Sequence, residues 1–429
     1  MTTPTSDGVQ PMLPASFSRP RVLYYALAVL LLPFLAINLN FPHSFTGYSI
    51  AAAFVLHVMA RHRPREWLAA ALVGLVLNQS ARLVASLFHM PGKAPIVSFA
   101  MLGAGSLIVL GWPAVWKRVA DASNLQNIYL PSVVLVALVL ISQLMLLVTP
   151  IRRVETFDVY LQMFDLSLVW PPVFALGRIF QRVNDARSIA LNTYLFLPIV
   201  VAVVCGGYIR FRKASAWATL KVMAIAGLLG YATYLLFPAA GPEYVPAFNF
   251  PTGFFSLADI HTGYSRALLP PVAAARNAMP SLHLAWALLL WFESKALPRV
   301  FRLLTFVYVV LTIIVVLGLG EHYIADLVVA VPFSVLVLAI CSSTTTSAST
   351  RRKASLGSTL MVSGWLALLR YGTALFVLSP ILPWTMTIVS TAVSAILVSP
   401  LLGTANDPNN HDMHQAEVSM PESTVNNRL

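Results

Sequence analysis

Apolar runs long enough to cross a lipid bilayer recur along most of this chain. A membrane-spanning helix needs about 20 mainly apolar residues, and twelve segments approach or reach that length. They lie at Val22–Asn38, Tyr48–Met59, Trp67–Leu87, Val97–Trp116, Ile128–Val148, Leu191–Ile209, Ala216–Phe237, Leu282–Leu297, Leu303–Leu319, Tyr323–Ile340, Leu360–Leu378 and Ile381–Leu402. Because 58% of the 429 residues are hydrophobic and only 10% are charged, the composition excludes a soluble domain. We predict an all-α polytopic membrane protein with about twelve transmembrane helices.

Basic residues in the connecting loops predict how these helices are oriented, because cytoplasmic loops carry an excess of Lys and Arg. Placing the N-terminus in the cytoplasm puts six basic segments on that side. They are Arg19/Arg21, Arg61/Arg63/Arg65, Lys117/Arg118, Arg210/Arg212/Lys213, Lys295/Arg299/Arg302 and Arg351/Arg352/Lys353. These loops, together with attraction to anionic membrane lipids, explain the net charge of +12, so no nucleic acid is expected as a partner.

Residues 151–188 are the exception to this pattern, since their arginines fall on the outer face. Asp158, Asp165 and the Pro171-Pro172 pair interrupt the apolar pieces of this region. We predict one or two interfacial or re-entrant helices here, in which the two aspartates cap helices or pair with arginines.

The chain ends and the cysteines constrain the fold less. Residues 1–20 and 403–429 are polar and are predicted to be a disordered leader and a disordered tail. No cleavable signal is evident, so the first apolar run is expected to stay as an anchor. Cys205 and Cys341 lie in or at the end of apolar runs and are predicted to be packing residues.

Two polar motifs interrupt the apolar sequence between residues 278 and 330. Pro-Ser-Leu-His occupies residues 280–283, and Glu-His-Tyr-Ile-Ala-Asp occupies residues 321–326. Two apolar segments and a short charged turn separate the motifs, which is the pattern of a helical hairpin that crosses a membrane out and back. Both histidines, His283 and His322, are therefore expected at the same membrane face.

The residue types in these motifs suit phosphate chemistry. Ser281 is expected to cap the helix that follows it, and a helix N-terminus binds anions. His322 and Asp326 are four residues apart, so on a helix they share a face, where the carboxylate can orient the imidazole. His283, across a phosphate-sized gap, can give a proton to a leaving oxygen. Either histidine alone suits packing equally well, but their joint spacing and shared side favour a catalytic site.

The connection from Pro238 to Pro280 is long for a segment without a span of its own, so we expect it to be functional or lid-like. Asp259 and His261 lie within it. No third ligand follows at a suitable spacing, so no metal is expected.

Together with the Pro-rich stretch at residues 237–244, the two motifs resemble the type 2 phosphatidic acid phosphatase superfamily. They most resemble the branch that contains fungal inositol phosphorylceramide synthase, over roughly residues 157–340. The resemblance implies a six-helix catalytic core that works without a metal or other cofactor. It implies that His322 attacks phosphorus to form a phosphohistidine, Asp326 orients His322, His283 is the general acid and Ser281 lines the phosphate pocket.

Two departures from the superfamily pattern matter. Its phosphatases carry a Lys/Arg-Pro element before the first motif, which has no Lys-containing counterpart here, and an arginine six residues before the second histidine, where this chain has Val316. Another cation must then balance the phosphate charge. Arg276 and Arg266 are the first candidates, followed by Arg152, Arg153, Arg178 and Arg182. Tyr323 is a further candidate for substrate binding, although it also suits packing or an interfacial aromatic belt.

We therefore predict a membrane enzyme that acts at the outer face on a lipid phosphate, its substrate among the membrane lipids. It would be an inositolphosphotransferase-like phosphotransferase or a lipid phosphate phosphatase. The alternatives are a lipid transporter or scramblase, for which the usual internal pseudo-symmetry is not evident, and a catalytically inactive member of the superfamily. The expected organisation is N-terminal transmembrane helices at residues 21–120, the catalytic core at 125–342 and a C-terminal transmembrane hairpin at 355–402.

Overall fold

The computed structural model describes residues 44–60, 63–87, 99–115, 125–152, 156–168, 172–253, 274–342 and 346–403. Within these ranges the chain is helical and has no strand, as predicted for an all-α protein. The α-helices are α2 (Phe45–Ala60), α3 (Pro64–Leu87), α4 (Phe99–Val115), α6 (Leu130–Arg152), α7 (Asp158–Ser167), α8 (Pro172–Arg182), α9 (Ala186–Leu195), α10 (Leu197–Gly207), α11 (Trp217–Leu236), α13 (Leu282–Glu293), α14 (Arg299–Gly318), α15 (Ile324–Cys341), α16 (Ala348–Tyr371), α17 (Ala374–Leu378) and α18 (Ile381–Gly403). Short π- and 3-10 segments are η2 (Leu125–Tyr129), η3 (Tyr208–Arg212), η4 (Pro242–Tyr244), η5 (Pro246–Phe248) and η6 (Ser294–Ala296). The predicted leader, the predicted span Val22–Asn38 and the predicted tail beyond Gly403 lie outside the described residues.

Among the described residues, five helices are long and apolar enough to cross a membrane. They are α6 with its preceding turn (Gln126–Arg152), α11, α14, α15 and α18. Two bent pairs, α7 with α8 and α9 with α10, raise the number to seven if each pair forms one span. These apolar helices are consistent with the predicted integral membrane protein, whereas the predicted number of twelve spans is not confirmed.

Local features of the sequence explain why fewer helices than predicted are long and apolar enough to cross a membrane. Helix α13 has only 12 residues, about 18 Å of helix, which is short of a bilayer core of about 30 Å. Helix α3 contains Glu66, Asn78 and Arg82, which lower its mean hydropathy. Helix α16 starts with a basic first turn and ends at Tyr371, so the predicted span Leu360–Leu378 is broken before α17.

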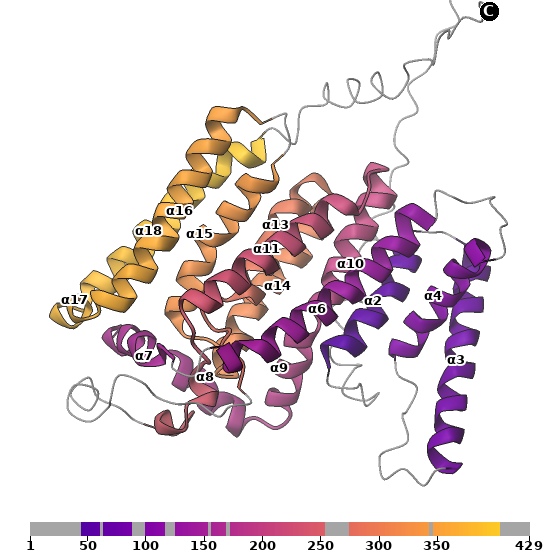
Figure 1. Cartoon of the computed structure of the whole chain (residues 1–429), viewed down its shortest axis with the longest axis horizontal. Helices are drawn as coiled ribbons and strands as arrows, with labels where there is room; N and C mark the ends of the chain where they lie inside the picture. Colours follow the sequence, from indigo (N-terminus) through magenta and orange to yellow (C-terminus); the bar gives the residue numbers. More distant parts are fainter. Residues whose placement is uncertain are drawn as a thin grey trace, which may run out of the picture.

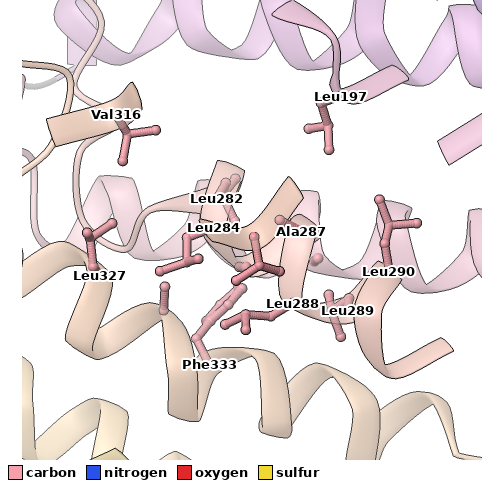
Figure 2. Close-up of a cluster of buried hydrophobic side chains, with 14 of the residues drawn as sticks. Leu197, Leu282, Leu284, Ala287, Leu288, Leu289, Leu290, Val316, Leu327 and Phe333 are labelled. Atoms are coloured by element: carbon pink, nitrogen blue, oxygen red, sulfur yellow. The ribbon is translucent and has the colours of Figure 1, made fainter. Parts of the chain in front are cut away.

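Helix α15 lies inside the bundle, with α16 and α18 on one side and α11, α13 and α14 on the other (Figure 1). In the most apolar stretch of α15, 72% of the residues are buried, against 17% in the most apolar stretch of Gln126–Arg152. Figure 2 shows Phe333 of α15 pointing toward Leu284 and Leu288 of α13. Val316 of α14 and Leu327 of α15 belong to the same buried hydrophobic cluster. This core fixes α13 and α15 side by side, so their first residues are held close together.

The two ends of the bundle differ in their residues. Helices α7, α8 and α9 lie at the end where α15 begins (Figure 1). Helices α7 and α8 lie within residues 151–188, where one or two interfacial or re-entrant helices are predicted. Their interfacial or re-entrant placement stays a prediction. At the other end of α13, Arg212 Nε donates to the carbonyl of Ala296, and the Tyr208 hydroxyl donates to the carbonyl of Glu293 over 2.6 Å. Two of the predicted cytoplasmic basic segments therefore meet at the end of the bundle opposite the histidine motifs.

Flanking helices cover this central bundle on two sides (Figure 1). Helix α2 packs against α10 and α6, and it carries α3 and α4 on its outer side. Helices α16 and α18 pack against α15, and α16 also contacts α7. The division of the chain into a core and two flanking units remains a prediction.

Candidate active site

His322 lies in a tight connection between α14 and α15. After α14 ends at Gly318, the backbone N–H groups of Glu321 and His322 both donate to the carbonyl of Val316, over 3.0 and 3.3 Å. Gly320 has a φ of +72°, which a side chain would strain. This turn places His322 before the helix, so the expectation that His322 and Asp326 share a helix face is wrong, because α15 begins only at Ile324.

The ring of His322 is held through its Nδ1 atom. Nδ1 lies 2.9 Å from the carbonyl oxygen of Ala278 and 3.4 Å from Oδ2 of Asp326. A carbonyl accepts only, so Nδ1 carries the proton and Nε2 keeps its lone pair. Burial lowers the pKa of His322 to about 4, although the charge of Glu321 and the Ala278 carbonyl act in the opposite direction. His322 is therefore neutral near pH 7, which is the form that acts as a nucleophile.

Asp326 has a second task at the start of α15. Its Oδ2 atom accepts the backbone N–H of Tyr323 over 2.8 Å, which forms a capping box at the helix start. The side chain is completely buried. Asp326 thus orders the turn that carries His322, and its contact with the imidazole is longer than that of the Ala278 carbonyl.

Ser281 caps α13, as predicted. Its side chain accepts from the backbone N–H of Leu284 at 3.5 Å, and its own N–H donates to the backbone carbonyl of Asp326 at 3.3 Å. The second bond joins the start of α13 to the start of α15. His283 and His322 therefore lie at the same end of the bundle, on adjacent helix starts.

His283 is buried among aromatic rings. Its ring stacks on Tyr194 of α9 with centroids 3.8 Å apart, and Phe45 of α2 lies 5.4 Å from it. Its Nε2 atom is buried and has no hydrogen-bond partner among the described residues. The sequence analysis did not identify Tyr194 and Phe45, because an aromatic residue in an apolar run carries no signal of which distant residue it contacts.

Asp158 of α7 ties several segments to the site. Its carboxylate accepts the Tyr323 hydroxyl over 2.9 Å and the backbone N–H groups of Gly241 and Ala240 over 2.9 and 3.0 Å. Asp165, on the same helix, accepts the backbone N–H of Ile324 over 3.1 Å. Asp165 therefore caps α15, one of the roles predicted for the two aspartates, whereas Asp158 binds backbone N–H groups of the loop after α11. Tyr323 is completely buried, with its hydroxyl engaged by Asp158, which supports the packing interpretation of this residue.

The described cations near the site are Arg276 and Arg187. Arg276 is 2% exposed and donates from its backbone N–H to Thr149 Oγ1 over 2.9 Å. Burial lowers the pKa of Arg276, and the nearby charge of Asp158 opposes that shift. Arg187 of α9 pairs with Glu243 over 2.8 Å. Arg266, the other predicted cation, lies outside the described residues.

Arg187 and Glu243 belong to a polar group beside His322. The N–H of Glu243 donates to the Gly320 carbonyl over 3.0 Å, and the Tyr244 hydroxyl donates to Glu321 over 2.8 Å. Burial raises the pKa of Glu321, the residue next to His322. The backbone is so close here that a Cβ on Gly241, whose φ is +100°, would overlap the carbonyl of Glu321.

Among the described residues, no group of three or more His, Cys, Asp or Glu side chains is arranged to hold a metal ion. Asp259 and His261 fall outside the described residues. Metal-independent chemistry therefore stays a prediction.

This geometry joins two histidines, a serine cap and buried carboxylates at one end of a helix bundle. Residues 159–342 match the PAP2 superfamily model. The PAP2 match supports the predicted superfamily, the type 2 phosphatidic acid phosphatases, and with it phosphatase or phosphotransferase chemistry on lipid phosphates in general. The inositol phosphorylceramide synthase-like branch is not confirmed. No curated protein and no solved structure matches the chain.

The PAP2 segment runs from α7 to the end of α15 and includes both histidine motifs. It leaves out α2, α3, α4 and α6 before it and α16, α17 and α18 after it. At Val316, where phosphatases of the superfamily carry an arginine, the side chain is completely buried and packs in the hydrophobic core (Figure 2). Position 316 therefore provides no cation to this site.

Proposed function

We propose that this protein transfers a phosphoryl group from a lipid-linked phosphate through a phosphohistidine on His322. The observation that supports this most strongly is the Nδ1 contact of His322 with the Ala278 carbonyl. It commits Nδ1 to donation and leaves Nε2 as the nucleophilic atom, within a segment that matches the PAP2 superfamily.

In the first half-reaction, the Nε2 lone pair of His322 forms a bond to phosphorus while the bond from phosphorus to the lipid oxygen breaks. The departing oxygen takes a proton from His283, which enters this step as the imidazolium and leaves it neutral, and whose Nε2 has no competing partner among the described residues. In the second half-reaction, an acceptor hydroxyl gives its proton to His283 and attacks phosphorus. The Nε2–phosphorus bond then breaks, and both histidines return to their starting states.

Phosphate charge would be balanced by the site's cations and by the start of α13. Ser281, at the cap of α13, is proposed to line the phosphate pocket, where backbone N–H groups of a helix start favour an anion. Arg276 is our first choice for the cation, and its buried position next to the site supports this role.

The acceptor decides whether the enzyme is a phosphatase or a transferase. We favour a transferase of the inositolphosphotransferase-like type, because the chain lacks the Lys/Arg-Pro element of the phosphatases and has Val316 where they carry an arginine. We also propose that the N-terminus is cytoplasmic and that the site faces the outer side, since two basic segments meet at the opposite end of the bundle.

Phosphoenzyme trapping tests the proposal. Purified protein is incubated with a lipid phosphate whose phosphorus is radiolabelled, quenched in alkali and resolved on a gel, because phosphohistidine survives alkali and is lost in acid. We expect label on the wild type and on a His411→Ala control in the C-terminal tail, and none on His322→Ala. A His283→Ala variant should form the phosphoenzyme slowly with lipid substrates.

Product analysis then separates the acceptors. Free phosphate and phosphorylated alcohol are measured with and without inositol or a ceramide-like alcohol. Unchanged turnover in His322→Ala would refute the mechanism. Lipid movement across vesicles without any phosphoenzyme would favour a transporter or scramblase, and neither activity would indicate an inactive member of the superfamily.

A further inference from the structure

A cavity of about 310 Å³ opens between α6, α10, α11 and α13. Its lining is mainly apolar. It includes Leu135 to Leu146 on α6 and Met223 to Tyr234 on α11, each an interval of eleven residues, which corresponds to about 16 Å along a helix. The cavity is therefore elongated along the helices.

One end of this cavity reaches the candidate active site. His283 forms part of the wall, and its buried Nε2 atom has no partner among the described residues. Asn277 and Tyr234 line the same region, next to the start of α13. Beyond them the walls offer few polar groups, so a molecule that places a phosphate at His283 extends an apolar part into the cavity.

Helix α2 covers this cavity on the side of α10. The Phe45 ring lies 5.4 Å from both Tyr194 and His283, and Thr46 donates a 2.9 Å hydrogen bond to Gln143, a lining residue of α6. Helix α2 lies outside the segment that matches the PAP2 superfamily. Phe45 of α2 therefore adds to the cavity wall from outside the matched segment.

We propose that this cavity binds one apolar chain of the lipid phosphate and that α2, through Phe45, completes the binding site. The chain lies between α6 and α11 with its phosphate end at His283. The inference rests on the proposed function, because it takes the phosphate end of the substrate to be at the histidines. It assigns the N-terminal helices a role in selecting the lipid.

Trp286 of α13 and Gly227 of α11 lie next to each other in the cavity wall. The indole Nε1 of Trp286 donates to the Met223 carbonyl over 3.1 Å, which fixes the ring in the wall. A Cβ on Gly227 would lie 3.5 Å from this indole, an ordinary contact. Alanine therefore fits at position 227, whereas a larger side chain projects into the space that the lipid chain would occupy.

The test uses Gly227→Leu with Gly364→Leu as its matched control. Gly364 is a helical glycine of α16 with no atom within 4 Å of a built Cβ, so leucine there reaches open space. Phosphoryl transfer is measured with phosphatidic acids of short, medium and long chains in mixed micelles. We expect Gly227→Leu to lower kcat/KM for the long chain about tenfold or more relative to the short chain, and Gly364→Leu to leave that ratio unchanged. An unchanged ratio in Gly227→Leu, with turnover retained, would overturn the proposal.

A direct binding measurement separates this inference from the proposed function. Full-length protein is photolabelled with a phosphatidic acid that carries a diazirine at the end of one chain, and the modified peptides are mapped by mass spectrometry. We expect labels on α6 and α11 in the wild type and loss of these labels in Gly227→Leu. Labels there without any phosphoenzyme would leave the cavity assignment standing and refute the catalytic one. A phosphoenzyme with labels only on lipid-facing surfaces would do the reverse.

Discussion

The hydroxyl of Tyr323 donates a 2.9 Å hydrogen bond to Asp158, a residue 165 positions earlier in the chain. Both side chains are completely buried. Tyr323 directly follows His322, so the bond connects the position of α7 to the position of the candidate nucleophile.

Removing this hydroxyl tests that connection. Tyr323→Phe should lower the free energy of unfolding by about 1 kcal/mol, since one buried acceptor loses a partner, and should slow phosphoenzyme formation less than His322→Ala does. Thermal unfolding in detergent and label incorporation measure the two effects. Tyr308→Phe is the control, because that hydroxyl lies on α14 and makes a long, 3.5 Å contact with the Thr193 carbonyl besides a hydrogen bond with Thr312. Equal effects of both variants would contradict a special role for Tyr323.

The Nδ1 atom of His322 contacts both the Ala278 carbonyl and Asp326, so we expect Asp326→Asn and Asp326→Ala to have different effects. An asparagine there can still accept the Tyr323 N–H, and the Ala278 carbonyl still fixes the tautomer of His322. We expect Asp326→Asn to keep near-normal stability and a measurable rate of phosphoryl transfer. Asp326→Ala loses the cap and should cost about 1 kcal/mol. A folded Asp326→Asn protein as inactive as His322→Ala would show that the negative charge itself is required.

The pKa of His322 sets the pH below which phosphoenzyme formation should slow, which we call the acid limit of the reaction. Burial lowers this pKa to about 4, so the neutral nucleophile persists well below the ordinary histidine value of about 6.5. We expect the rate of phosphoenzyme formation to fall as the pH decreases through about 4. The same shift contributes stability that is complete above pH 6.5 and is lost as the pH falls toward 4, because the unfolded chain then binds the extra proton.

Glu321→Gln provides the check on this assignment. Glu321 raises the pKa of His322 only while its carboxylate is charged, and burial raises the pKa of Glu321 itself. Near pH 4 this carboxyl is therefore protonated, so Glu321→Gln should leave the acid limit where it is in the wild type. Rate profiles measured by rapid quench on both proteins test this, and a limit near pH 6.5, or one that moves in Glu321→Gln, would contradict the assigned titration.

Sidedness can be measured by cysteine labelling. Asn184→Cys in the exposed turn between α8 and α9 and Arg299→Cys at the start of α14 lie at opposite ends of the bundle. In a background with Cys205→Ser and Cys341→Ser, a membrane-impermeant maleimide should label position 184 in intact cells and position 299 only after lysis. The reverse pattern would invert the proposed topology.

We expect Arg370 of α16 to stabilise the packing of the C-terminal helices against α7. Its guanidinium lies 4.5 Å from the Phe157 ring centroid and 4.8 Å from that of Tyr160, and it donates to the Tyr160 hydroxyl. Arg370→Met should lower the free energy of unfolding by about 1–2 kcal/mol, and Arg370→Lys should recover part of it because lysine keeps the charge without the planar group. Arg352→Met, an exposed change in the same helix, should have little effect on the thermal unfolding midpoint.

Local features were predictable where one short stretch of chain decides them. The Pro-Ser pair before Leu282 predicted the cap of α13, and the apolar runs predicted α11, α14, α15 and α18. The environment of His322 was not predictable in the same way, because Gly320 and the Val316 carbonyl turn the chain before α15 begins. Contacts such as Tyr194 with His283 depend on how separate helices pack, and periodicity carries no record of that packing.

The near-contact between Gly241 and the carbonyl of Glu321 has a mechanical consequence. No side chain fits between these two backbones at position 241, and the Glu243 N–H also donates to the Gly320 carbonyl. We therefore expect residues 241–243 and 320–322 to move together if this face opens to admit a bulky acceptor.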